Sequence, residues 1–316
     1  MEKKELLVVM DMQYTMRRHL HRLRKYEEEN KRHMLTYEGH ETGRLYFAMK
    51  DFMAIAKYTS DKQADLCVCL DTKTNRKEDS SEYKAGRDKL ENVDIVALQN
   101  MEKVIVNSGI TTLKCEGYEA DDCIASVVKN KYDEYNKIVI FTPDSDLCAL
   151  IDDKVAVFRY KSVYSMYGNK GKHADFMSAH YYVDRNSYEE YLSKENDGRV
   201  PYNSIMLLKC TVGDKSDKVK GIKGFGIRAF EKYINQLEKN NIDLRQLGDA
   251  DFVDDIIQRS AQLLGVEKLG EARAALRLVR PRTCDELETT VKEKSATIPD
   301  LDKIRDELAN FGIMSL

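Results

Sequence analysis

Acidic side chains in this sequence recur where a buried strand is expected to end. Asp11 follows the apolar run LLVVM, and Asp71 follows the apolar run LCVCL. A third apolar run, KIVIF, leads into FTPDSD, which contains Asp144 and Asp146. Ligands of an open parallel sheet bind beyond the carboxyl ends of its strands, so we expect these carboxylates to face one site.

Two further groups of acids extend this set. The string EADD supplies Glu119, Asp121 and Asp122 to the first turn of an expected helix, and GDKSD supplies Asp214 and Asp217. Carboxylates gathered in this way repel one another and take up protons unless a cation neutralises them. Hard divalent cations such as magnesium prefer such oxygen ligands, so the pattern favours a metal site.

Each acidic motif also has a structural explanation. Glu119 and Asp121 could stabilise a helix N-terminus through its dipole. Asp144 could be a turn residue after the preceding proline, and Asp11 and Asp71 could cap helices. The joint placement of the acids, each after an apolar strand or at a helix start, favours the metal site over these separate explanations.

The elements that must position these acids alternate between strands and helices. The expected strands are 6–10, 66–70, 103–106, 111–115, 137–141 and 155–158. Apolar residues recur at helical spacing over 41–58 and 118–131, and the pattern is helical after about residue 200. This alternation predicts an α/β fold with a central, mostly parallel sheet flanked by helices.

As a set, the motifs resemble the flap-endonuclease family, especially the 5′-nucleases of bacteriophages and the 5′-nuclease domain of bacterial DNA polymerase I. The matching strings follow the family's order over most of the chain: LLVVMD with Arg18 beyond it, LCVCLD, EYKAGR, GYEADD, TPDSDL and VGDKSDKVKGIKGFG. The resemblance implies a PIN-like nuclease domain over 1–200, with a helical arch at about 72–98. A helix–hairpin–helix and C-terminal helical region would occupy 201–316.

The resemblance also implies a site for two Mg²⁺ ions, with Mn²⁺ able to substitute. The family's roles place Asp71, Glu119, Asp121 and Asp144 around the first ion, Asp146 and Asp214 around the second, and Asp11, Asp122 and Asp217 outside them. The outer acids would act through metal-bound water. Two ions about 3.5–4 Å apart can activate a water and stabilise the leaving oxygen during displacement at phosphorus. The implied reaction is phosphodiester hydrolysis that leaves a 5′-phosphate.

Basic residues of the expected arch fall on the family's YK-x-x-R pattern, which here contains Tyr83, Lys84 and Arg87. Lys84 and Arg87 are three residues apart and would share one face of a helix. They could grip the scissile phosphate, Lys84 as a point charge and Arg87 as a planar fork. The alternative is a solvated, charged helix without a catalytic role. Arg18 is a further expected DNA contact.

The string GIKGFG at 221–226 resembles the turn of a helix–hairpin–helix. Glycines such as Gly224 and Gly226 let backbone N–H groups approach a phosphate, next to the positive end of the following helix. The cations expected to grip the duplex backbone are Lys215, Lys218, Lys220, Lys223 and Arg228. By resemblance, K⁺ could bridge this hairpin and the DNA. The alternative is a glycine C-cap that joins two packed helices.

Two positions depart from the family's pattern. Met12 follows Asp11 where the family usually has glycine, so we expect the local backbone to differ. Phe230 stands where a small residue is expected, which predicts different packing after the hairpin.

The motifs together predict a structure-specific 5′-nuclease for branched, nicked or 5′-ended DNA, with RNA primers as further substrates. Primer removal in replication, a phage origin, a monomeric state and replication proteins as partners follow from the resemblance. One alternative is a non-catalytic binder of DNA junctions, but neither Lys84 nor any acid of the family is missing. A toxin-like ribonuclease is a further alternative, although such proteins usually lack the arch and GIKGFG.

Composition agrees with a folded protein that has a hydrophobic core. The 316 residues are 42% hydrophobic, and no apolar run approaches the roughly 18 residues of a membrane span. With 51 basic and 54 acidic residues the formal net charge is −3, which argues against a simple basic DNA-coating protein. The seven cysteines show no CxxC pair, so we expect buried thiols in a reducing cytoplasm rather than zinc or disulfides.

Overall fold

The computed structural model describes residues 3–13, 17, 23–24, 27–29, 36–38, 40–76, 81, 83–84, 90–142, 144–160, 180–183, 204–215, 217–260, 266–283 and 285–316. Its strands are β1 (Lys4–Asp11), β2 (Thr36–Tyr37), β3 (His40–Glu41), β4 (Asp65–Cys69), β5 (Thr111–Leu113), β6 (Tyr135–Phe141), β7 (Val155–Tyr160), β8 (His180–Val183), β9 (Gly213–Asp214) and β10 (Val219–Lys220). Its α-helices are α2 (Gly43–Asp61), α4 (Asn92–Asn107), α5 (Ala120–Lys131), α8 (Ile205–Thr211), α9 (Ile227–Lys239), α10 (Ala250–Arg259), α12 (Val266–Val279), α13 (Asp285–Glu293) and α14 (Leu301–Ala309), with 3₁₀ turns η1 (Asp146–Leu150) and η4 (Leu244–Gly248).

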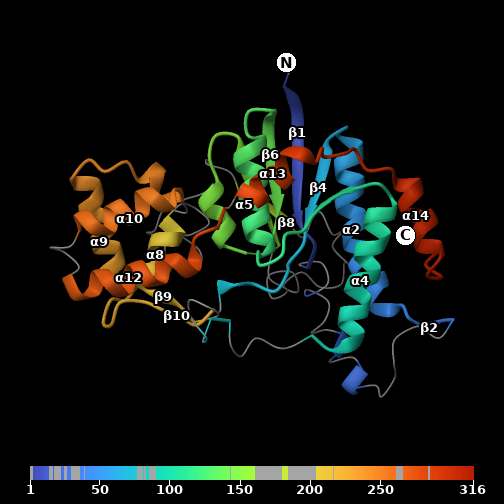
Figure 1. The fold of residues 1–316 in the computed structure, drawn as a ribbon, viewed down its shortest axis with the longest axis horizontal. Coiled ribbons are helices and arrows are strands. Elements are labelled where there is room, and N and C mark those ends of the chain that lie inside the picture. Colours follow the sequence, from blue (N-terminus) through green and yellow to red (C-terminus); the bar gives the residue numbers. More distant parts are fainter. Residues whose placement is uncertain are drawn as a thin grey trace, which may run out of the picture.

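A six-stranded sheet in the order β5-β4-β1-β6-β7-β8 forms the centre of the molecule (Figure 1). Its first five strands pair in parallel, and β8 is an antiparallel edge strand. The register places Asp11 beside Cys69 and Met10 beside Phe141. The carboxyl ends of β1, β4 and β6 therefore meet at one edge, as the sequence predicted, and the predicted α/β fold class is confirmed.

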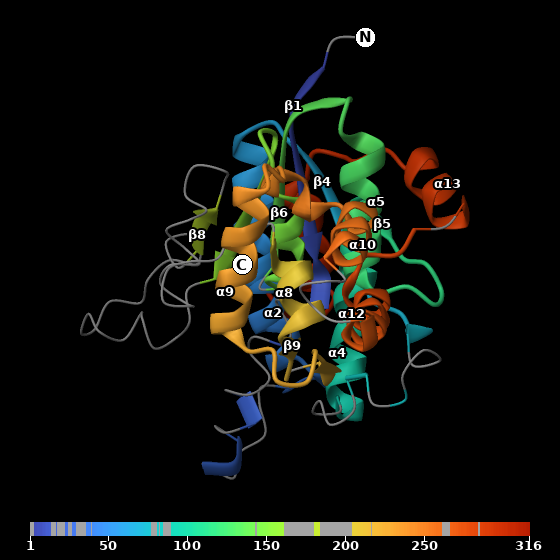
Figure 2. The ribbon, with the colours of Figure 1, turned by 90° about the vertical axis from the view of Figure 1, so that its left-hand side faces the viewer.

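Helices cover both faces of the sheet, and β1 shows why its sequence is a continuous apolar run. Leu7 and Val9 enter the core on the α5 side, whereas Val8 and Met10 enter the core under α2 and α4. All four side chains are fully buried. Burying each one contributes about 1.5–3 kcal/mol to stability. Figures 1 and 2 show α5 and α2 on opposite sides of the strands.

The C-terminal helices α8, α9, α10 and α12 form a lobe beside the sheet, at the left of Figure 1. Antiparallel β9 and β10 make a short hairpin between α8 and α9. The side chains of the lobe share one core with α5, and Phe230 on α9 is fully buried in it. The large residue that departs from the family's pattern is therefore a core residue here. The boundary at residue 200 and the helix–hairpin–helix stay predictions.

The expected strand at 103–106 is wrong, because this segment is the last part of α4. A capping box formed by Glu91 and Asp94 starts the helix. Ala97, Met101 and Val104 follow at helical spacing and are buried against α2. The β-branched run VIV favours a strand locally, but burial of the apolar face of the whole helix outweighs that preference. The expected arch at 72–98 therefore overlaps α4 from Asn92 onward.

The string ALRLVRPRT at 275–283 resembles a late strand-like segment of the family, but the structure is different there. Helix α12 continues to Val279, because Ala272, Ala275, Leu276 and Val279 recur at helical spacing and are buried. An irregular segment then follows from Arg280 to Thr283.

A buried ion network attaches Arg24 and Glu27, from the N-terminal part of the chain, to α2 and α4. The fully buried Asp94 carboxylate accepts hydrogen bonds from Arg24 and Arg44, and Arg44 also donates to Glu27 at 2.9 Å. Burial raises the pKa of Asp94, but the Glu91 N–H and both arginines outweigh burial and lower the pKa below its ordinary value. Asp94 therefore stays ionised, caps α4 and anchors both arginines.

The six described cysteines, all except Cys284, are buried, as the sequence predicted. Cys284 itself lies outside the described residues. None of the described helices combines the length and the apolar character that a membrane crossing requires.

Candidate active site

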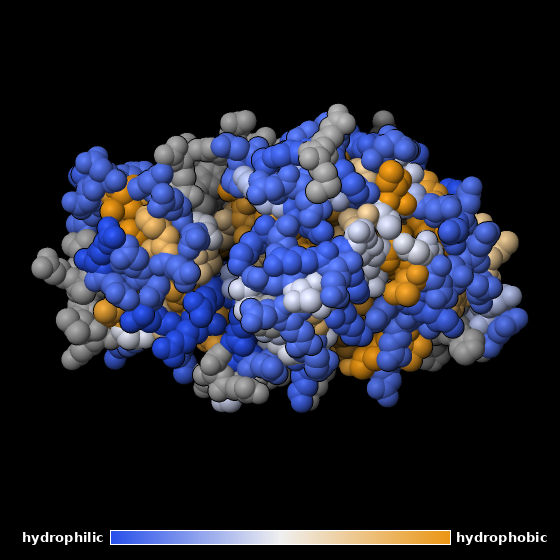
Figure 3. Space-filling view, turned by 45° about the horizontal axis from the view of Figure 1, so that its top comes forward, coloured by the Kyte–Doolittle hydropathy of each residue, from blue (hydrophilic) through white to orange (hydrophobic). Residues whose placement is uncertain are grey.

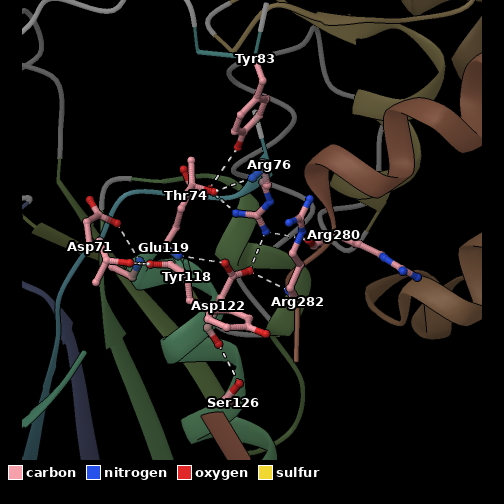
Figure 4. A network of polar contacts seen from close by, with 12 residues as sticks. Asp71, Thr74, Arg76, Tyr83, Tyr118, Glu119, Asp122, Ser126, Arg280 and Arg282 are labelled. Carbon is pink, nitrogen blue, oxygen red and sulfur yellow. Dashed lines mark hydrogen bonds and ion pairs between the residues drawn. The ribbon is translucent and has the colours of Figure 1, made fainter. Parts of the chain in front are cut away.

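The N-terminus of α5 is fixed by its own acids and by the end of β4. Glu119 is the N-cap, and its backbone N–H donates to Asp122 Oδ2 at 3.0 Å in a capping box. The next N–H, of Ala120, donates to Asp71 Oδ1 at 2.7 Å. Figure 4 shows Asp71, Glu119 and Asp122 around this helix start. These acids therefore do stabilise the start of a helix, which was the structural explanation considered for them. They also lie together at one site.

Asp11 and Asp144 also make local contacts. Asp11 Oδ1 accepts the Gln13 N–H at 3.0 Å, and Asp144 Oδ1 accepts the Asp146 N–H at 3.0 Å. Such contacts shape the turns that follow the strands. Each carboxylate has a second oxygen, so these turns do not exhaust its capacity to accept or ligate.

Asp121 is the point at which four strand-end and helix-start acids interact. Burial raises the pKa of Asp121 well above its ordinary value, and Asp144, Asp11 and Asp71 raise it further, against the effect of Lys84. Burial also raises the pKa of Asp71, partly opposed by the Ala120 N–H. These contributions associate Asp11, Asp71 and Asp144 with Asp121 at the carboxyl edge of the sheet.

Arg76 is a functional candidate that the sequence motifs did not reveal. Its buried guanidinium contacts the Glu119 carboxylate and donates to Asp122 Oδ1 at 2.6 Å. The same Nη2 donates to the Arg280 carbonyl at 2.9 Å. The fork thus holds the N-cap Glu119 and the first-turn Asp122 of α5 in place (Figure 4). The one available signal was an arginine close behind the strand-end acid Asp71.

Tyr83 and Lys84 of the predicted arch pattern reach the acids. The Tyr83 hydroxyl donates to Glu119 Oε2 at 3.2 Å, and Lys84 Nζ donates to Glu119 Oε1 at 2.7 Å. Burial raises the pKa of Glu119, but Lys84 and Arg76 outweigh burial and lower it below its ordinary value. Glu119 is therefore ionised at neutral pH.

We expected Lys84 and Arg87 to share one face of a helix. This prediction is wrong for Lys84, which lies in a turn with a left-handed backbone (φ 52°). Its N–H donates to the Asp217 carbonyl at 3.0 Å, which attaches the turn to the hairpin region. Arg87 and Arg18 lie outside the described residues, so their predicted roles are not placed.

Lys209 on α8 is a second cation that the motifs did not reveal. Its ammonium contacts the Asp146 carboxylate and lies 2.5 Å from Asp214 Oδ2. Burial raises the pKa of Asp146 to about 7, and Asp144 contributes to the rise while Lys209 opposes it. A lysine inside the apolar run IMLLKCT, close before GDKSD, was the available signal.

The predicted second-ion acids also meet the hairpin. Asp214 lies on β9, and its Oδ1 accepts the Asp217 N–H at 3.3 Å. Asp217 is buried. Asp217 and Lys84 also line a small cavity together with Glu119, Asp121 and Asp146.

Within the part of the chain that the structure describes, no three His, Cys, Asp or Glu side chains are arranged as direct ligands of one ion. Arg76, Lys84 and Lys209 neutralise the acids instead. The donors are nevertheless of the type that Mg²⁺ prefers, since all are carboxylate oxygens. Burial, Asp144 and Asp11 raise the pKa of Asp121 despite Lys84, so the chemistry of the donor set fits a divalent ion.

The hairpin presents its predicted DNA-binding residues to solvent. The exposed residues are Lys215, Lys218, Lys220, Lys223, Gly224, Gly226 and Arg228. Gly224 has φ 77°, and no atom lies within 4 Å of the position that a Cβ would take. At Gly221 a Cβ would lie 2.3 Å from the Val212 carbonyl carbon, so this turn requires glycine. The lysines and Arg228 thus lie on and around the hairpin and are not part of the carboxylate site.

Comparison with known proteins identifies the family. Residues 6–178 match the model described as 5′-3′ exonuclease, N-terminal resolvase-like domain. The chain belongs to the 5′-3′ exonuclease family. The predicted family is thus confirmed, and with it the prediction of a metal-dependent nuclease at the level of the family.

Relatives of this 5′-3′ exonuclease family member differ in length. It is 24% identical over 291 residues to the 5′-3′ exonuclease of Aquifex aeolicus, covering 89% of this chain and 86% of the relative. It is 30% identical over 185 residues to DNA polymerase I of Caldicellulosiruptor bescii, covering 58% of this chain but only 20% of the polymerase. The chain therefore spans about a fifth of that polymerase's length.

Solved structures show the same fold. T5 5′-exonuclease with bound zinc has a TM-score of 0.56 and 17% identity, over 97% of this chain and 99% of that chain. T5 D15 protein co-crystallised with metal ions has the same score and identity, over 96% of this chain and 99% of that chain. The predicted PIN-like core is thereby confirmed as a fold.

Divalent metal affinity of this family member should increase as the pH rises through about 7, where Asp146 loses its proton. A carboxyl group must be deprotonated to bind a metal, so protons compete with the ion below this pH. The folded pKa lies above the ordinary value of 3.8, so the metal-free protein should lose stability as the pH rises between the two values. Titrations of the protein with Mn²⁺ below and above pH 7 measure this change in metal affinity.

The matched variant for the Mn²⁺ titration is Asp146→Asn, because the asparagine side chain does not take up or lose a proton in this pH range. It should bind Mn²⁺ more weakly and with a flatter pH dependence in this window. An unchanged pH dependence in Asp146→Asn would assign the proton competition to another group.

Proposed function

We propose that this chain is a structure-specific 5′-nuclease that hydrolyses phosphodiester bonds of DNA, or of RNA paired with DNA, near 5′ ends, flaps and nicks. One observation carries the proposal: acids from three strand ends and from the start of α5 interact at Asp121, with Lys84 at their edge. Membership of the 5′-3′ exonuclease family supports the reaction class.

Two Mg²⁺ ions, replaceable by Mn²⁺, are the proposed cofactors. The proposed ligands are Asp71, Glu119, Asp121 and Asp144 for one ion and Asp146 and Asp214 for the other, with Asp11, Asp122 and Asp217 around them. When bound, such ions supply an activated water and charge stabilisation of the leaving oxygen. The divalent ions in the T5 5′-exonuclease structure support a metal in this fold.

Side chains of this chain would position the substrate phosphate. Lys84 Nζ now donates to Glu119, and once Glu119 has another partner, Lys84 can donate to a phosphate oxygen. Arg76 keeps Glu119 and Asp122 oriented during this exchange. Tyr83 closes one side of the small cavity, and Leu278 and Val279 form an apolar wall that limits the access of water.

The exposed hairpin would bind the duplex. Its lysines can neutralise backbone phosphates, while backbone N–H groups at Gly224 and Gly226 can donate to a phosphate or share it with K⁺. We also propose that the protein acts as a monomer in primer removal during replication, with replication proteins as partners. The DNA polymerase I relatives support this role.

Cleavage assays on labelled 5′-flap, nicked and single-stranded DNA test the proposal. We expect cleavage with Mg²⁺ or Mn²⁺, its loss in excess EDTA, and its recovery when the metal is restored. Cleavage that persists in EDTA would contradict the metal mechanism. Absence of cleavage of every substrate with either metal would contradict the nuclease function.

Lys84→Ala and Lys223→Ala should affect different steps. Lys84→Ala should lower the single-turnover rate about 100-fold, the cost of losing one donor to the reacting group, with little change in duplex affinity. Lys223→Ala should instead weaken binding and reduce the salt slope of log K by about 0.9 per lost phosphate contact. Binding and rate measurements over a salt series distinguish the two.

Lys303→Ala is the matched control for these variants. Lys303 is exposed on α14, at the opposite end of the molecule from the hairpin (Figure 1). It should leave both rate and salt slope unchanged. If Lys84→Ala and Lys223→Ala change the same quantity, the proposed division between arch and hairpin is wrong.

A further inference from the structure

A cavity of about 590 Å³ lies between α5, α8, the start of α10 and the segment that follows α12. Four of its lining residues are cations: Lys129, Arg277, Arg280 and Arg282. We call this space the basic cavity. Its volume lies within the roughly 300–1,000 Å³ range of small-ligand sites, large enough for a nucleotide unit. None of these four cations belongs to the hairpin.

The positive charge of the basic cavity is only partly neutralised. Within the described residues, the exposed side chains of Arg277 and Arg280 have no carboxylate partner. Asp249 also lines the cavity, but its Oδ1 accepts hydrogen bonds as the N-cap of α10. The other acid of the lining is the exposed Asp251. The lining holds four cations and two acids, and one of the cations, Lys129, is paired with Glu288 at 2.8 Å.

Apolar surface accompanies this charge. Tyr118, Leu150 and Met206 line the same space. A nucleotide presents both an anionic phosphate and a largely apolar sugar and base face, so the mixture suits a nucleic-acid strand better than a small inorganic anion.

The basic cavity adjoins the carboxylate site directly. Pro281 lines both the basic cavity and the small cavity that contains Glu119 and Asp121. The segment between them is attached to the site, because the Arg280 carbonyl accepts from Arg76 and the Arg282 N–H donates to Asp122 Oδ1 at 2.6 Å. In Figure 4 the Arg280 side chain extends away from these acids.

Figure 3 shows very hydrophilic side chains gathered between the lobe of C-terminal helices and the body built on the sheet. A strand that reaches the carboxylates and continues across the 280–282 segment would meet the basic cavity next.

We propose that the basic cavity binds backbone phosphates of the substrate strand next to the scissile position, through Arg277 and Arg280. This proposal rests on the proposed nuclease function and adds a phosphate subsite separate from the hairpin. Arginine suits the role because its planar guanidinium donates two parallel hydrogen bonds to a phosphate. Phosphate contacts position a substrate without selecting its sequence.

The test uses the full chain with Arg277→Ala and Arg280→Ala combined. Binding of a labelled 5′-flap DNA is measured in Ca²⁺ over a salt series. The variant should bind about tenfold more weakly at low salt, and the slope of log K against log salt should fall by about 0.9 for each lost contact. Arg273→Ala is the matched control, because Arg273 lies on the same helix but pairs with Asp254 and does not line the basic cavity.

Methylphosphonates that neutralise one backbone phosphate at a time locate the contact. One or two positions near the cleavage site should weaken wild-type binding and leave the double variant unaffected. Equal losses in wild type and variant at every position would overturn the proposal.

A competition arm distinguishes the source of the phosphate. If inorganic phosphate or a mononucleotide binds the wild type but not the double variant, and DNA affinity is equal in both, the basic cavity binds free phosphate and the strand assignment fails. A double variant that matches Arg273→Ala in affinity and salt slope likewise overturns it. If the wild type neither binds nor cuts the flap, the proposed nuclease function fails instead.

Discussion

Asp121→Asn should lower turnover at least about 100-fold and at the same time stabilise the metal-free protein. Loss of an outer partner of a metal site already costs 10–100-fold in affinity or activity, and Asp121 is proposed as a direct ligand. Its carboxylate is also the one that Asp144, Asp11 and Asp71 all repel. The same substitution therefore removes a ligand and relieves a repulsion.

The stability effect has a defined sign. The folded-state pKa of Asp121 lies well above the ordinary 3.8, first because of burial and then because of the neighbouring acids. The unfolded chain ionises at the ordinary value, so the free energy of unfolding falls as the pH rises from that value towards the folded pKa. Asparagine carries no charge and avoids this loss. Denaturant unfolding in EDTA should show a stabilised variant at neutral pH and little difference in mild acid.

Asp122→Asn is the matched control on the adjacent residue. Asp122 Oδ1 accepts from Arg76 and from the Arg282 N–H, each at 2.6 Å, and Oδ2 accepts the Glu119 N–H at 3.0 Å. An amide has one oxygen, so its NH₂ group must face one of these donors. An unsatisfied buried donor costs about 1–3 kcal/mol, so this variant should be destabilised.

Opposite stability changes at adjacent residues would separate a repelled acid from a structural one. If Asp121→Asn destabilises the metal-free protein as much as Asp122→Asn does, the repulsion at Asp121 is overestimated. If it retains wild-type turnover in Mg²⁺, Asp121 is not a ligand.

The strand-end acids could be predicted from the sequence because two local signals determine their position. Apolar runs such as LLVVM have little alternative to a buried strand, and parallel strands end at a common edge. Once the sheet is known, Asp11 and Asp71 can therefore be located at the edge where its parallel strands end. Tyr83 and Lys84 could be placed near Glu119 only through the family's pattern.

Arg76 and Lys209 could not be predicted in this way. Neither stands in an acidic motif, and a charged residue within a polar loop or on a short helix is usually solvated. Their roles arise from tertiary packing, which buries Arg76 against Glu119 and places Lys209 between Asp146 and Asp214. A local pattern carries no information on such long-range ion pairs.

The misassigned segments have a related cause. The β-branched VIV of α4 and the RLVRPR string, which begins in the last turn of α12 and continues beyond it, each resemble a strand over four or five residues. Burial of a helical stripe extends over more than a dozen residues, as with Ala97, Met101 and Val104, and so outweighs the short pattern. The basic cavity could not be foreseen either, because it depends on where α12 ends.

Arg76→Ala should reduce the free energy of unfolding by about 3–5 kcal/mol, the usual cost of leaving buried ionic partners uncompensated. Arg76 is only 3% exposed, and its loss would leave Glu119 and Asp122 buried beside each other without their shared cation. Lys84 still contacts Glu119, so the larger part of the loss should come from Asp122.

Arg76→Lys should recover only part of this stability, because one ammonium cannot reproduce the fork that reaches Glu119, Asp122 and the Arg280 carbonyl. The loss in Arg76→Ala should be fully present at neutral pH and shrink in acid, where both carboxyls take up protons. Arg273→Ala, which breaks the exposed pair with Asp254, should cost less than about 1 kcal/mol. Denaturant unfolding of the three variants across pH decides the matter: equal, small losses would show that Arg76 does not compensate these acids.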